Sequence, residues 1–290
     1  MTIPLISVII TTKNEEDNIR YCLKSIKQQT YPKEFIEMIV IDNNSTDKTK
    51  EIAKQYTKLV FNFGPERSAQ RNYGINKCHG EYFLQLDADQ SLDKNVIEEC
   101  VKKIVNFKDN DKSNNYFADI ALQVPENIVG SKNYFNRIRN YEKVFYTNSV
   151  IDCVRFIPTK IIKDIGGYDC SLNGPEDWDL DQRIREKCYI DIIDSHMDHN
   201  EGNVTFLKFL EKKWYYSKSF GKYISKWGKN NRYVKLRLGF FYRYIGVFVE
   251  NKKYKNVLIH PMLFASLIGT KLILGGVFLG RTFADKFKTR

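Results

Sequence analysis

The chain has 290 residues, of which 42% are hydrophobic, and it carries a formal net charge of +11. This length suits an α/β domain with an appendage, and the hydrophobic fraction is enough for a large core. The six cysteines form no CxxC pair, which argues against the usual zinc-ligand spacing and the disulfide framework of small secreted domains. We therefore expect reduced thiols in a cytosolic compartment.

The positive charge lies in the C-terminal third. Between Glu201 and Arg290 there are 19 Lys or Arg and 4 acidic residues, a net charge of +15, which leaves −4 for residues 1–200. Such asymmetry predicts a polyanionic partner, either a membrane or a nucleic acid. The N-terminal apolar run has no basic segment before it and no small-residue cleavage site, so we expect no signal peptide and a protein on the cytoplasmic side.

The N-terminal part alternates between apolar, β-branched runs and segments with helical spacing. Leu5–Thr12 is a continuous apolar run, as expected for a parallel strand covered on both faces. The elements predicted next are a helix over Glu16–Gln28, a strand over Phe35–Ile41, a helix over Asp47–Tyr56, a strand over Lys58–Asn62, a helix within residues 64–80 and a strand over Glu81–Leu86. This alternation predicts a doubly wound α/β sheet, in which ligands bind beyond the carboxyl ends of the strands.

Polar residues follow the predicted strands at that edge: Thr12 and Glu15, Asp42, Arg67 and Arg71 in the following helix, then Asp87 and Asp89. No GxGxxG motif follows the first strand and the chain has no GxxxxGK[ST] motif, which argues against a dinucleotide fold and a P-loop enzyme. We expect Asp42 to accept from a nucleotide base or ribose, and Arg67 or Arg71 to face its diphosphate. The alternative for Arg71 is an ion pair on the helix surface.

Asp87 and Asp89 lie in the segment FLQLDADQSLD, where an apolar run ends in two carboxylates. In an extended strand these two residues point to the same side. Two such carboxylates suit a divalent cation, Mg²⁺ or Mn²⁺, which commonly also holds a diphosphate. The alternative is that Asp89 only starts a turn, with Asp93 capping a helix from about Asn95 to Val105.

Four segments resemble the successive blocks of family 2 glycosyltransferases with a GT-A fold: SVIITTKNEEDNI, IVIDNNSTDKT, GPERSAQRNYGINKCHGEYFLQLDAD and GGYDCSLNGPEDWDLDQRI. The resemblance covers residues 4 to about 200. It implies that Thr12 and Glu15 line the nucleotide pocket, that Asp42 binds the base, that Asp87 lies near the nucleotide and that Asp89 holds the metal. The sequence departs from the family at Lys13, where many relatives have an aromatic residue, and it lacks the frequent QxxRW block.

The middle of the chain continues the pattern. We expect a surface loop over Asn106–Asn115, a strand over Tyr116–Gln123, a helix over Ile128–Tyr146, a strand within Asn148–Pro158, and the helix and turn IIKDIGGYD, in which Gly166 and Gly167 supply a tight turn.

The segment GPEDWDLDQRI is the second chemical centre. Glycosyl transfer to a hydroxyl needs a general base, and Asp177 is the candidate, with Glu176 beside it. Alternatively, Pro175, Glu176 and Asp177 form the first turn of a helix, where Pro and acids are favoured, and both interpretations can hold together. One of two nearby histidines, His196 or His199, is expected to complete the metal site, and we select His199; the alternative is an ordinary hydrogen-bonding residue.

Residues 206–250 interleave Lys and Arg with aromatic residues, which suits an anionic lipid surface or single-stranded nucleic acid. No RNA-binding signature accompanies them, so a membrane is favoured. Residues 257–280 form a 24-residue run in which only Lys271 is charged. Basic residues flank the run on both sides, which predicts a re-entrant or interfacial helix pair bent near Gly269 or Gly275 rather than a simple crossing. The alternative is a buried core helix.

The sequence thus predicts a GT-A α/β catalytic domain over residues 1–203 and a helical, membrane-associating region over residues 204–290. The predicted activity is metal-dependent, inverting transfer of a sugar from a UDP- or GDP-linked donor to a hydroxyl, with a lipid-linked saccharide as acceptor. The expected location is peripheral or monotopic at the cytoplasmic face. The alternatives are a polyprenyl-phosphate glycosyltransferase, whose acceptor needs no base, a nonenzymatic basic binding module, and a nucleotidyltransferase, which leaves GPEDWDLD unexplained.

Overall fold

The computed structural model describes residues 3–110, 117–130 and 133–288 and divides the chain into two compact units. The first unit consists of Met1–Asn127, Cys153–Cys170 and Glu176–Asn200. The second consists of Ile128–Asp152, Ser171–Pro175 and Glu201–Arg290. The C-terminal part of the second unit thus begins close to the boundary expected after residue 203, and two earlier segments join it.

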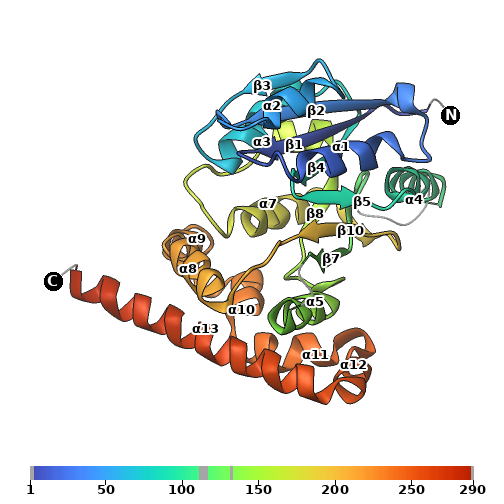
Figure 1. The fold of residues 1–290 in the computed structure, drawn as a ribbon. Helices are drawn as coiled ribbons and strands as arrows, with labels where there is room; N and C mark the ends of the chain where they lie inside the picture. Colours follow the sequence, from blue (N-terminus) through green and yellow to red (C-terminus); the bar gives the residue numbers. More distant parts are fainter. Residues whose placement is uncertain (1–2, 111–116, 131–132, 289–290) are drawn as a thin grey trace. The chain divides into compact units, whose positions relative to one another are not determined.

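The first unit is built on a seven-stranded sheet with the order β3-β2-β1-β4-β8-β6-β9 (Figure 1). The pairs β1·β2, β1·β4, β2·β3 and β6·β9 are parallel, while β8 is antiparallel to both of its neighbours. The strands are β1 Ile6–Thr12, β2 Ile36–Asp42, β3 Val60–Asn62, β4 Tyr82–Asp87, β6 Ile120–Gln123, β8 Val154–Pro158 and β9 Tyr189–Ile192. The prediction of a mostly parallel α/β sheet is confirmed.

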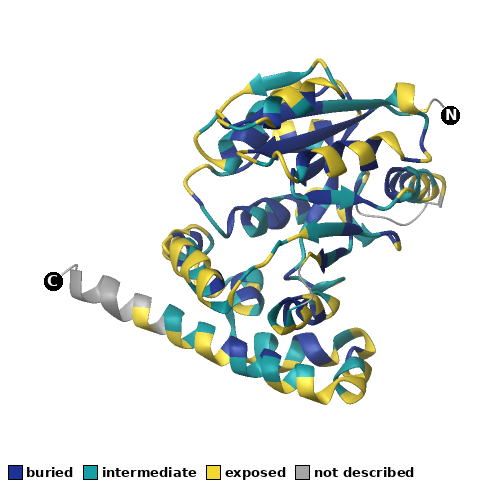
Figure 2. Ribbon diagram, in the orientation of Figure 1, coloured by how far each residue is buried: buried dark blue, intermediate teal, exposed yellow. Residues whose placement is uncertain are grey.

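Both faces of the central strands are buried. In β1, Ile10 belongs to a cluster that includes Leu23 and Ile97, and Ile9 belongs to a second cluster with Ile75. Figure 2 shows this strand as buried along its length. The flanking elements are α1 Ile19–Lys27, η1 Lys33–Phe35, α2 Thr49–Lys54, α3 Arg67–Lys77, α4 Val96–Asn110, α6 Thr159–Asp164 and α7 Glu176–Arg185. A strand covered on both faces explains the continuous apolar run in the sequence.

The register of the parallel strands brings polar residues to one edge of the sheet. Thr12 at the end of β1 pairs with Asp42 at the end of β2. On the other side of β1, Thr11 pairs with Asp87 at the end of β4. The carboxyl ends of three strands therefore form the edge where ligands bind in sheets of this kind.

A second, three-stranded sheet has the order β5-β10-β7 and was not predicted. Its strands are β5 Gln90–Leu92, β10 Met197–Asn200 and β7 Glu126–Val129. Segments of three or four residues are too short to show a period-2 pattern. The antiparallel register of β10 and β5 pairs His199 with Gln90 and so brings a histidine next to the Asp87-Asp89 segment.

Three predictions about the middle of the chain need correction. The expected loop over Asn106–Asn115 is wrong as far as Asn110, because α4 continues to that residue. Residues 111–115 lie outside the described residues, and so does Tyr116, the first residue of the next predicted strand. The single helix predicted over Ile128–Tyr146 is also wrong, because β7 runs to Val129 and α5 covers only Tyr134–Tyr146. In the strand predicted within Asn148–Pro158, only β8 is extended, from Val154.

The second unit is helical over the part of the chain that the structure describes. Its elements after α5 are α8 Phe206–Ser217, α9 Phe220–Trp227, α10 Arg232–Leu238, η2 Tyr242–Gly246, α11 Val247–Val249, η3 Glu250–Lys252, α12 Tyr254–Ile259 and α13 Pro261–Lys288. The predicted bent helix pair is wrong, since α13 continues without a break through Gly269 and Gly275.

Helix α13 is long and apolar enough to cross a membrane, by length and composition, over Pro261–Phe278, and no other helix among the described residues meets that test. Only 11% of this window is buried inside the chain. The alternative of a buried core helix therefore does not fit, because the window Pro261–Phe278 is mostly intermediate or exposed in its burial (Figure 2).

Candidate functional site

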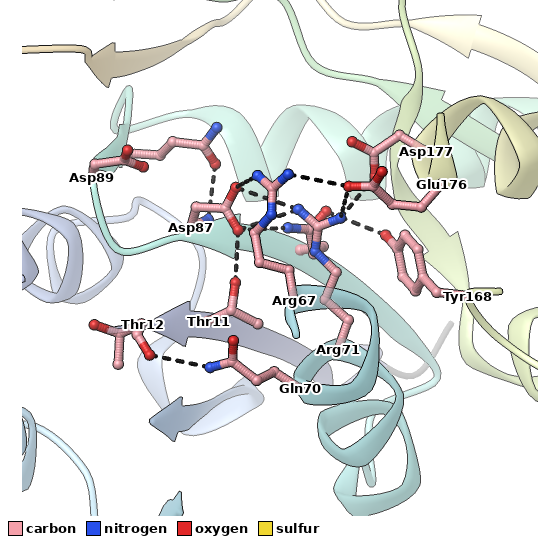
Figure 3. Close-up of polar contacts among 12 residues, drawn as sticks. Thr11, Thr12, Arg67, Gln70, Arg71, Asp87, Asp89, Tyr168, Glu176 and Asp177 are labelled. Atoms are coloured by element: carbon pink, nitrogen blue, oxygen red, sulfur yellow. Dashed lines mark hydrogen bonds and ion pairs between the residues drawn. The ribbon is translucent and has the colours of Figure 1, made fainter. Parts of the chain in front are cut away.

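The centre of the candidate site is a guanidinium group shared by two carboxylates. Arg71, on α3, donates from Nη1 to Asp177 Oδ1 at 2.8 Å. Its Nη2 donates to both oxygens of Asp87, at 3.2 and 3.3 Å. Arg71 is 1% exposed, so the predicted alternative of a surface ion pair is wrong. Figure 3 shows Arg71 between the end of β4 and the start of α7, which lie far apart in the sequence.

Electrostatics fix the charge states of this group. Burial lowers the pKa of Arg71, but Asp177 and Asp87 raise it more, so it stays well above its usual value. Burial raises the pKa of the Asp87 carboxyl, but Arg71 and Arg67 lower it more, so it lies well below its usual range. A hydrogen bond of 2.6 Å from Thr11 Oγ1 to Asp87 Oδ1 also favours the carboxylate. Asp87 is therefore ionised and already neutralised by arginine.

Arg67 lies one helical turn before Arg71 and is more exposed, at 38%. Its Nη2 donates to Glu176 Oε1 at 3.2 Å, and its Nη1 lies 3.7 Å from Asp87 Oδ2. Glu176 is only 2% exposed, and burial raises the pKa of its carboxyl. Asp177 is 31% exposed, and among the described residues its Oδ2 atom has no hydrogen-bond partner. Of the two acids, Asp177 is therefore the one that a ligand can reach.

A second layer of polar residues surrounds Asp87 and was not identified from the sequence. Gln85 Nε2 donates to Asp87 Oδ1 at 3.3 Å, and Gln85 Oε1 accepts from the Tyr168 hydroxyl at 3.2 Å. Arg71 stacks on the Tyr168 ring, with its Cζ atom 5.0 Å from the ring centroid. Arg155 on β8 donates to Gln85 at 3.4 Å. The polar Gln85 within an apolar strand was the only sequence signal for this layer.

The second predicted carboxylate, Asp89, lies in a different environment. The structure ends β4 at Asp87 and places Ala88 and Asp89 in a turn, so the expectation that both acids share the face of one strand is wrong. Asp89 Oδ2 lies 3.2 Å from His199 Nε2, and the other ring nitrogen of His199 lies 2.7 Å from Glu126 Oε1. The turn interpretation is correct for the backbone, and Asp89 still lies at the site edge.

Asp89, His199 and Glu126 form a chain of hydrogen bonds, with the imidazole between the two carboxylates. Asp89 Oδ1 is buried and has no hydrogen-bond partner among the described residues. Burial lowers the pKa of His199, but its hydrogen bonds to Asp89 and Glu126 raise it more, to about 10. A carboxylate on the far nitrogen is the usual way to orient a ligating histidine. The described residues contain no group of three or more His, Cys, Asp or Glu suited to a metal. A metal at Asp89 and His199 would therefore have to take its other ligands from substrate and water.

The remaining predicted residues line the same edge. The Thr12 hydroxyl is buried and has no hydrogen-bond partner in the described part of the chain. Burial, followed by Asp89 and Asp87, raises the pKa of Glu15, although Asn18 donates to it at 2.8 Å. Asp42 is fully buried, and both of its oxygens accept hydrogen bonds from Ser45. In this structure Asp42 therefore shapes the loop after β2, and its contact with a base stays a prediction.

The other predicted histidine lies apart from this arrangement. His196 is 40% exposed and lies 3.5 Å from Asp198 and 3.9 Å from Asp93. Of the two histidines, the structure brings only His199 to Asp89. The selection of His199 from the sequence is consistent with this geometry.

The sheet, with its acids and arginines at one edge, defines the class of GT-A glycosyltransferases. Residues 7–152 match the protein-family model described as Glycosyl transferase family 2. An uncharacterized glycosyltransferase of Methanocaldococcus jannaschii is 31% identical over 207 residues, which cover 67% of this chain and 69% of that protein. The chain therefore belongs to glycosyl transferase family 2, as the resemblance of its sequence blocks implied.

With other relatives, the match covers only part of each protein. Glycosyltransferase AglE of Haloferax volcanii is 31% identical over 176 residues, 58% of this chain and 57% of that protein. Glycosyltransferase GlyA of Streptococcus pneumoniae is 34% identical over 155 residues, 51% of this chain and 21% of that protein. The matched part of the chain thus spans a little more than half the length of AglE and about a fifth of the length of GlyA.

Solved structures show the same fold. A mannosyltransferase from Pyrobaculum calidifontis, PcManGT, in complex with GDP-Man and Mn²⁺, has a TM-score of 0.58 at 18% identity and matches 98% of this chain and 84% of its own. S. aureus TarS in complex with UDP-GlcNAc has a TM-score of 0.52 at 19% identity and matches 91% of this chain and 80% of its own. The predicted GT-A fold is confirmed.

Proposed function

We propose that the protein is a metal-dependent, inverting glycosyltransferase that transfers a sugar from a nucleoside-diphosphate sugar to a hydroxyl of a lipid-linked acceptor. The observation that carries the proposal is the Asp177 carboxylate. It lies at the first turn of α7, where buried Arg71 holds one of its oxygens, and its side chain is 31% exposed. A fixed carboxylate beside the ligand-binding edge of the sheet is what an acceptor hydroxyl needs as a general base.

The two acids of this segment take different roles in the proposal. Asp177 removes the proton of the acceptor hydroxyl as that oxygen attacks the anomeric carbon. Glu176 is buried and paired with Arg67 at 3.2 Å, so it holds the arginine in place rather than touching the acceptor. This assignment separates the two acids that the sequence analysis placed together as catalytic candidates, because Asp177 is 31% exposed and Glu176 only 2%.

The nucleotide-sugar donor is assigned to the residues at the carboxyl ends of the strands. Thr12, with its unpartnered hydroxyl, and Glu15 line the nucleotide pocket, while Asp42 supports the loop that faces the base. Arg67, the more exposed arginine, faces the diphosphate. Asp89 and His199 would hold Mg²⁺ or Mn²⁺, which would supply positive charge to stabilise the diphosphate leaving group. PcManGT is described with GDP-Man and Mn²⁺ and TarS with UDP-GlcNAc, which supports a nucleotide-sugar donor here.

The lipid-linked acceptor and the cytoplasmic membrane face are proposed from the surface of the second unit. Large apolar side chains are exposed on η2, α12 and α13 and near them, including Phe241 at 78%, Leu258 at 75% and Met262 at 75%. Together with the net charge of +15 after residue 200, this surface suits binding to an anionic bilayer. We propose a peripheral or monotopic protein that takes its acceptor from the lipid phase, with no nucleic acid as partner.

The experiment compares Asp177→Asn with Glu186→Gln, an exposed carboxylate one residue beyond α7. The first step finds the donor by thermal stability with UDP or GDP, each with and without Mn²⁺. Release of nucleoside diphosphate from the matching sugar is then measured with solubilised membrane lipids as acceptor. Loss of a general base predicts a rate roughly 10²- to 10⁴-fold lower for Asp177→Asn, with nucleotide binding retained and Glu186→Gln unchanged.

Two outcomes would contradict the proposal. Full activity of Asp177→Asn would favour a polyprenyl-phosphate glycosyltransferase, whose acceptor phosphate needs no base. The absence of any nucleotide-dependent stabilisation, with or without Mn²⁺, would favour a nonenzymatic binding module.

A further inference from the structure

Four cationic side chains from four elements of the second unit gather around two aromatic rings, and we call them the basic cluster: Arg139, Lys213, Arg243 and Lys271. Around the Phe209 ring, Arg139 Cζ lies 4.6 Å and Lys213 Nζ 5.3 Å from the centroid. Around the Tyr146 ring, Arg243 Cζ lies 5.3 Å and Lys271 Nζ 4.9 Å from the centroid.

The two halves of the basic cluster are joined by a carboxylate. Glu142, on α5, accepts hydrogen bonds from Arg139 and from the Tyr146 hydroxyl. Its Oε1 atom also lies 3.3 Å from Lys271 Nζ, which donates to the Tyr146 hydroxyl at 2.8 Å. Glu142 is 8% exposed and its charge is fully engaged in these contacts. Lys271, the lone charge in the apolar run, is therefore paired within the protein rather than left alone in a hydrophobic helix.

The basic cluster has more cations than carboxylates. Besides Glu142, Glu201 contributes one contact, to Arg139 at 3.1 Å. Four cations thus face two carboxylates. Lys213 and Arg243 each lie over an aromatic ring and form no ion pair with an acid among the described residues, although Glu142 favours the charged form of Lys213. An excess of positive charge in a half-buried place costs free energy unless an anion joins it.

The lowered pKa of Lys213 agrees with the excess of cations over carboxylates in the basic cluster. Burial lowers the pKa of Lys213 to about 7, with a further lowering by Arg139, Lys212 and Arg243 that Glu142 only partly offsets. A bound anion would favour the charged form. Lys213 offers three N–H donors and Arg243 five, and the guanidinium fork matches the geometry of phosphate oxygens.

We propose that the basic cluster binds the phosphate group of a membrane phospholipid. A lipid is favoured over a free ion because Lys271 of the cluster lies on the apolar helix α13. The Lys271 carbonyl accepts a hydrogen bond of 2.7 Å from the Tyr244 hydroxyl, which holds this part of α13 in the second unit. On the same helix, Leu272 and Ile273 are 57% and 50% exposed. A phospholipid whose phosphate is held at Lys213 and Arg243 would thus have its acyl chains beside an apolar helix. The proposal rests on the membrane part of the proposed function and not on the transfer reaction.

The test uses the full chain and the double variant Lys213→Gln/Arg243→Gln. The matched control is Lys222→Gln/Lys229→Gln, which removes two exposed cations from the same unit. Binding is measured by cosedimentation with phosphatidylcholine vesicles that contain or lack phosphatidylglycerol. We expect the cluster variant to bind the anionic vesicles roughly 25-fold more weakly than wild type, from about fivefold for each of the two basic residues, and the control to lose less than about threefold.

A soluble probe separates the site from the membrane surface. Short-chain dihexanoyl phosphatidylglycerol, below its micelle concentration, is expected to bind wild type with one-to-one stoichiometry in calorimetry. Lys213→Arg, which keeps the charge, should retain this binding and so exclude a folding defect as the cause of the loss. Inorganic phosphate is the competing probe and should bind much more weakly.

Four results would overturn the proposal. Equal losses in the cluster and control variants would show only diffuse surface attraction. Inorganic phosphate binding as tightly as the short-chain lipid would identify a free anion as the ligand. If wild type bound neither kind of vesicle, the membrane part of the proposed function would fail as well, whereas vesicle binding that is unchanged in the cluster variant would refute the phosphate site alone.

Discussion

Arg71 Nη1 donates a hydrogen bond of 2.8 Å to Asp177 Oδ1, although 106 positions separate the two residues. The arginine is almost completely buried and the carboxylate is partly exposed. The same guanidinium group also binds Asp87 at the end of β4. The contact therefore fixes the proposed base relative to the carboxyl edge of the sheet.

Removal of Arg71 should cost much more stability than removal of Arg67. Arg71→Met leaves Asp87 and Asp177 without their buried partner, and we expect the free energy of unfolding to fall by about 3 kcal/mol. Arg67→Met, at a side chain that is 38% exposed, should cost about 1 kcal/mol or less but weaken donor binding. Urea unfolding and nucleotide titration check both values. Equal, small losses for the two variants would refute the central role of Arg71.

Metal binding should depend on Asp89, then on Glu126, and not on Asp198. Asp89→Asn removes a proposed ligand and should abolish the Mn²⁺-dependent part of the nucleotide-induced rise in melting temperature. Glu126→Gln removes the carboxylate that orients His199 at 2.7 Å and should weaken Mn²⁺ affinity roughly 10- to 100-fold. Asp198→Asn, at an exposed acid on the same strand, is the control. Equal Mn²⁺ responses in Asp89→Asn and Asp198→Asn would rule out the assigned site.

Substitution of two adjacent glycines by alanine should distinguish the cost of backbone strain from the cost of a steric clash. Gly166 and Gly167 both have positive φ, +80° and +69°. A Cβ atom at Gly166 would meet nothing within 4 Å, so Gly166→Ala should cost about 1–2 kcal/mol, from backbone conformation alone. At Gly167 it would lie 2.4 Å from Asn72 Oδ1, which accepts from the Tyr168 backbone N–H.

Gly167→Ala should therefore destabilise the protein by roughly 1–3 kcal/mol more than Gly166→Ala, because Asn72 must move. Displacement of Asn72 would also loosen Tyr168, which supports Gln85 and Arg71. Chemical denaturation gives the difference, and the transfer rate should fall in parallel. Identical losses of stability in the two variants would show that the Asn72 contact is unimportant.

Binding to anionic vesicles should tighten as the pH falls. In the free protein the pKa of Lys213 is lowered to about 7, first by burial and then by neighbouring cations, so the residue loses its proton as the pH rises through that value. A bound phosphate favours the protonated form, so binding takes up a proton and weakens above about pH 7. The charged groups facing Lys213 are Arg139 and Glu142 on α5, Lys212 on α8 and Arg243 on η2.

The control for this pH dependence is Lys213→Arg, which stays charged over the whole range. Phosphatidylglycerol vesicles are suitable because their phosphodiester keeps its charge between about pH 6 and pH 9. Wild type should lose affinity across this range while Lys213→Arg should not. An equal pH dependence of the two proteins would assign the effect to another group.

The first half of the sheet could be predicted because its signals are local. The apolar run of β1 identifies a strand covered on both faces, and the helices between strands imply parallel pairing. Parallel pairing in turn places Thr12, Asp42 and Asp87 at one edge, as the register shows. The family blocks added the order of these segments along the chain.

The second sheet and the support around Asp87 could not be predicted in the same way. Strands β5, β7 and β10 are too short for a periodic pattern, so the position of His199 beside Asp89 had no local signal. Gln85 and Arg155 gave no motif. Asp42 was identified as a site residue, but the sequence did not indicate that Ser45 would occupy both of its oxygens.

The C-terminal region shows the same division. Its charge, its aromatic content and the apolar run were evident from composition, but the bend expected in that run is absent from α13. That expectation rested on the basic residues that flank the run, and the sequence indicated no partner for Lys271, its only charged residue. In the structure it reaches Tyr146, 125 positions earlier, and Glu142 beside it.

The sequence by itself determined the strands and helices of the first unit, the edge at which their polar residues lie and the family of the chain, because apolar periodicity, capping and motif spacing are properties of neighbouring residues. Only the tertiary structure decided which charges meet: Arg71 with Asp177, His199 with Asp89 and Lys271 with Glu142. Such pairs form between segments far apart in the chain, since the packing of the core, and not local propensity, determines which side chains share a buried place and must neutralise one another.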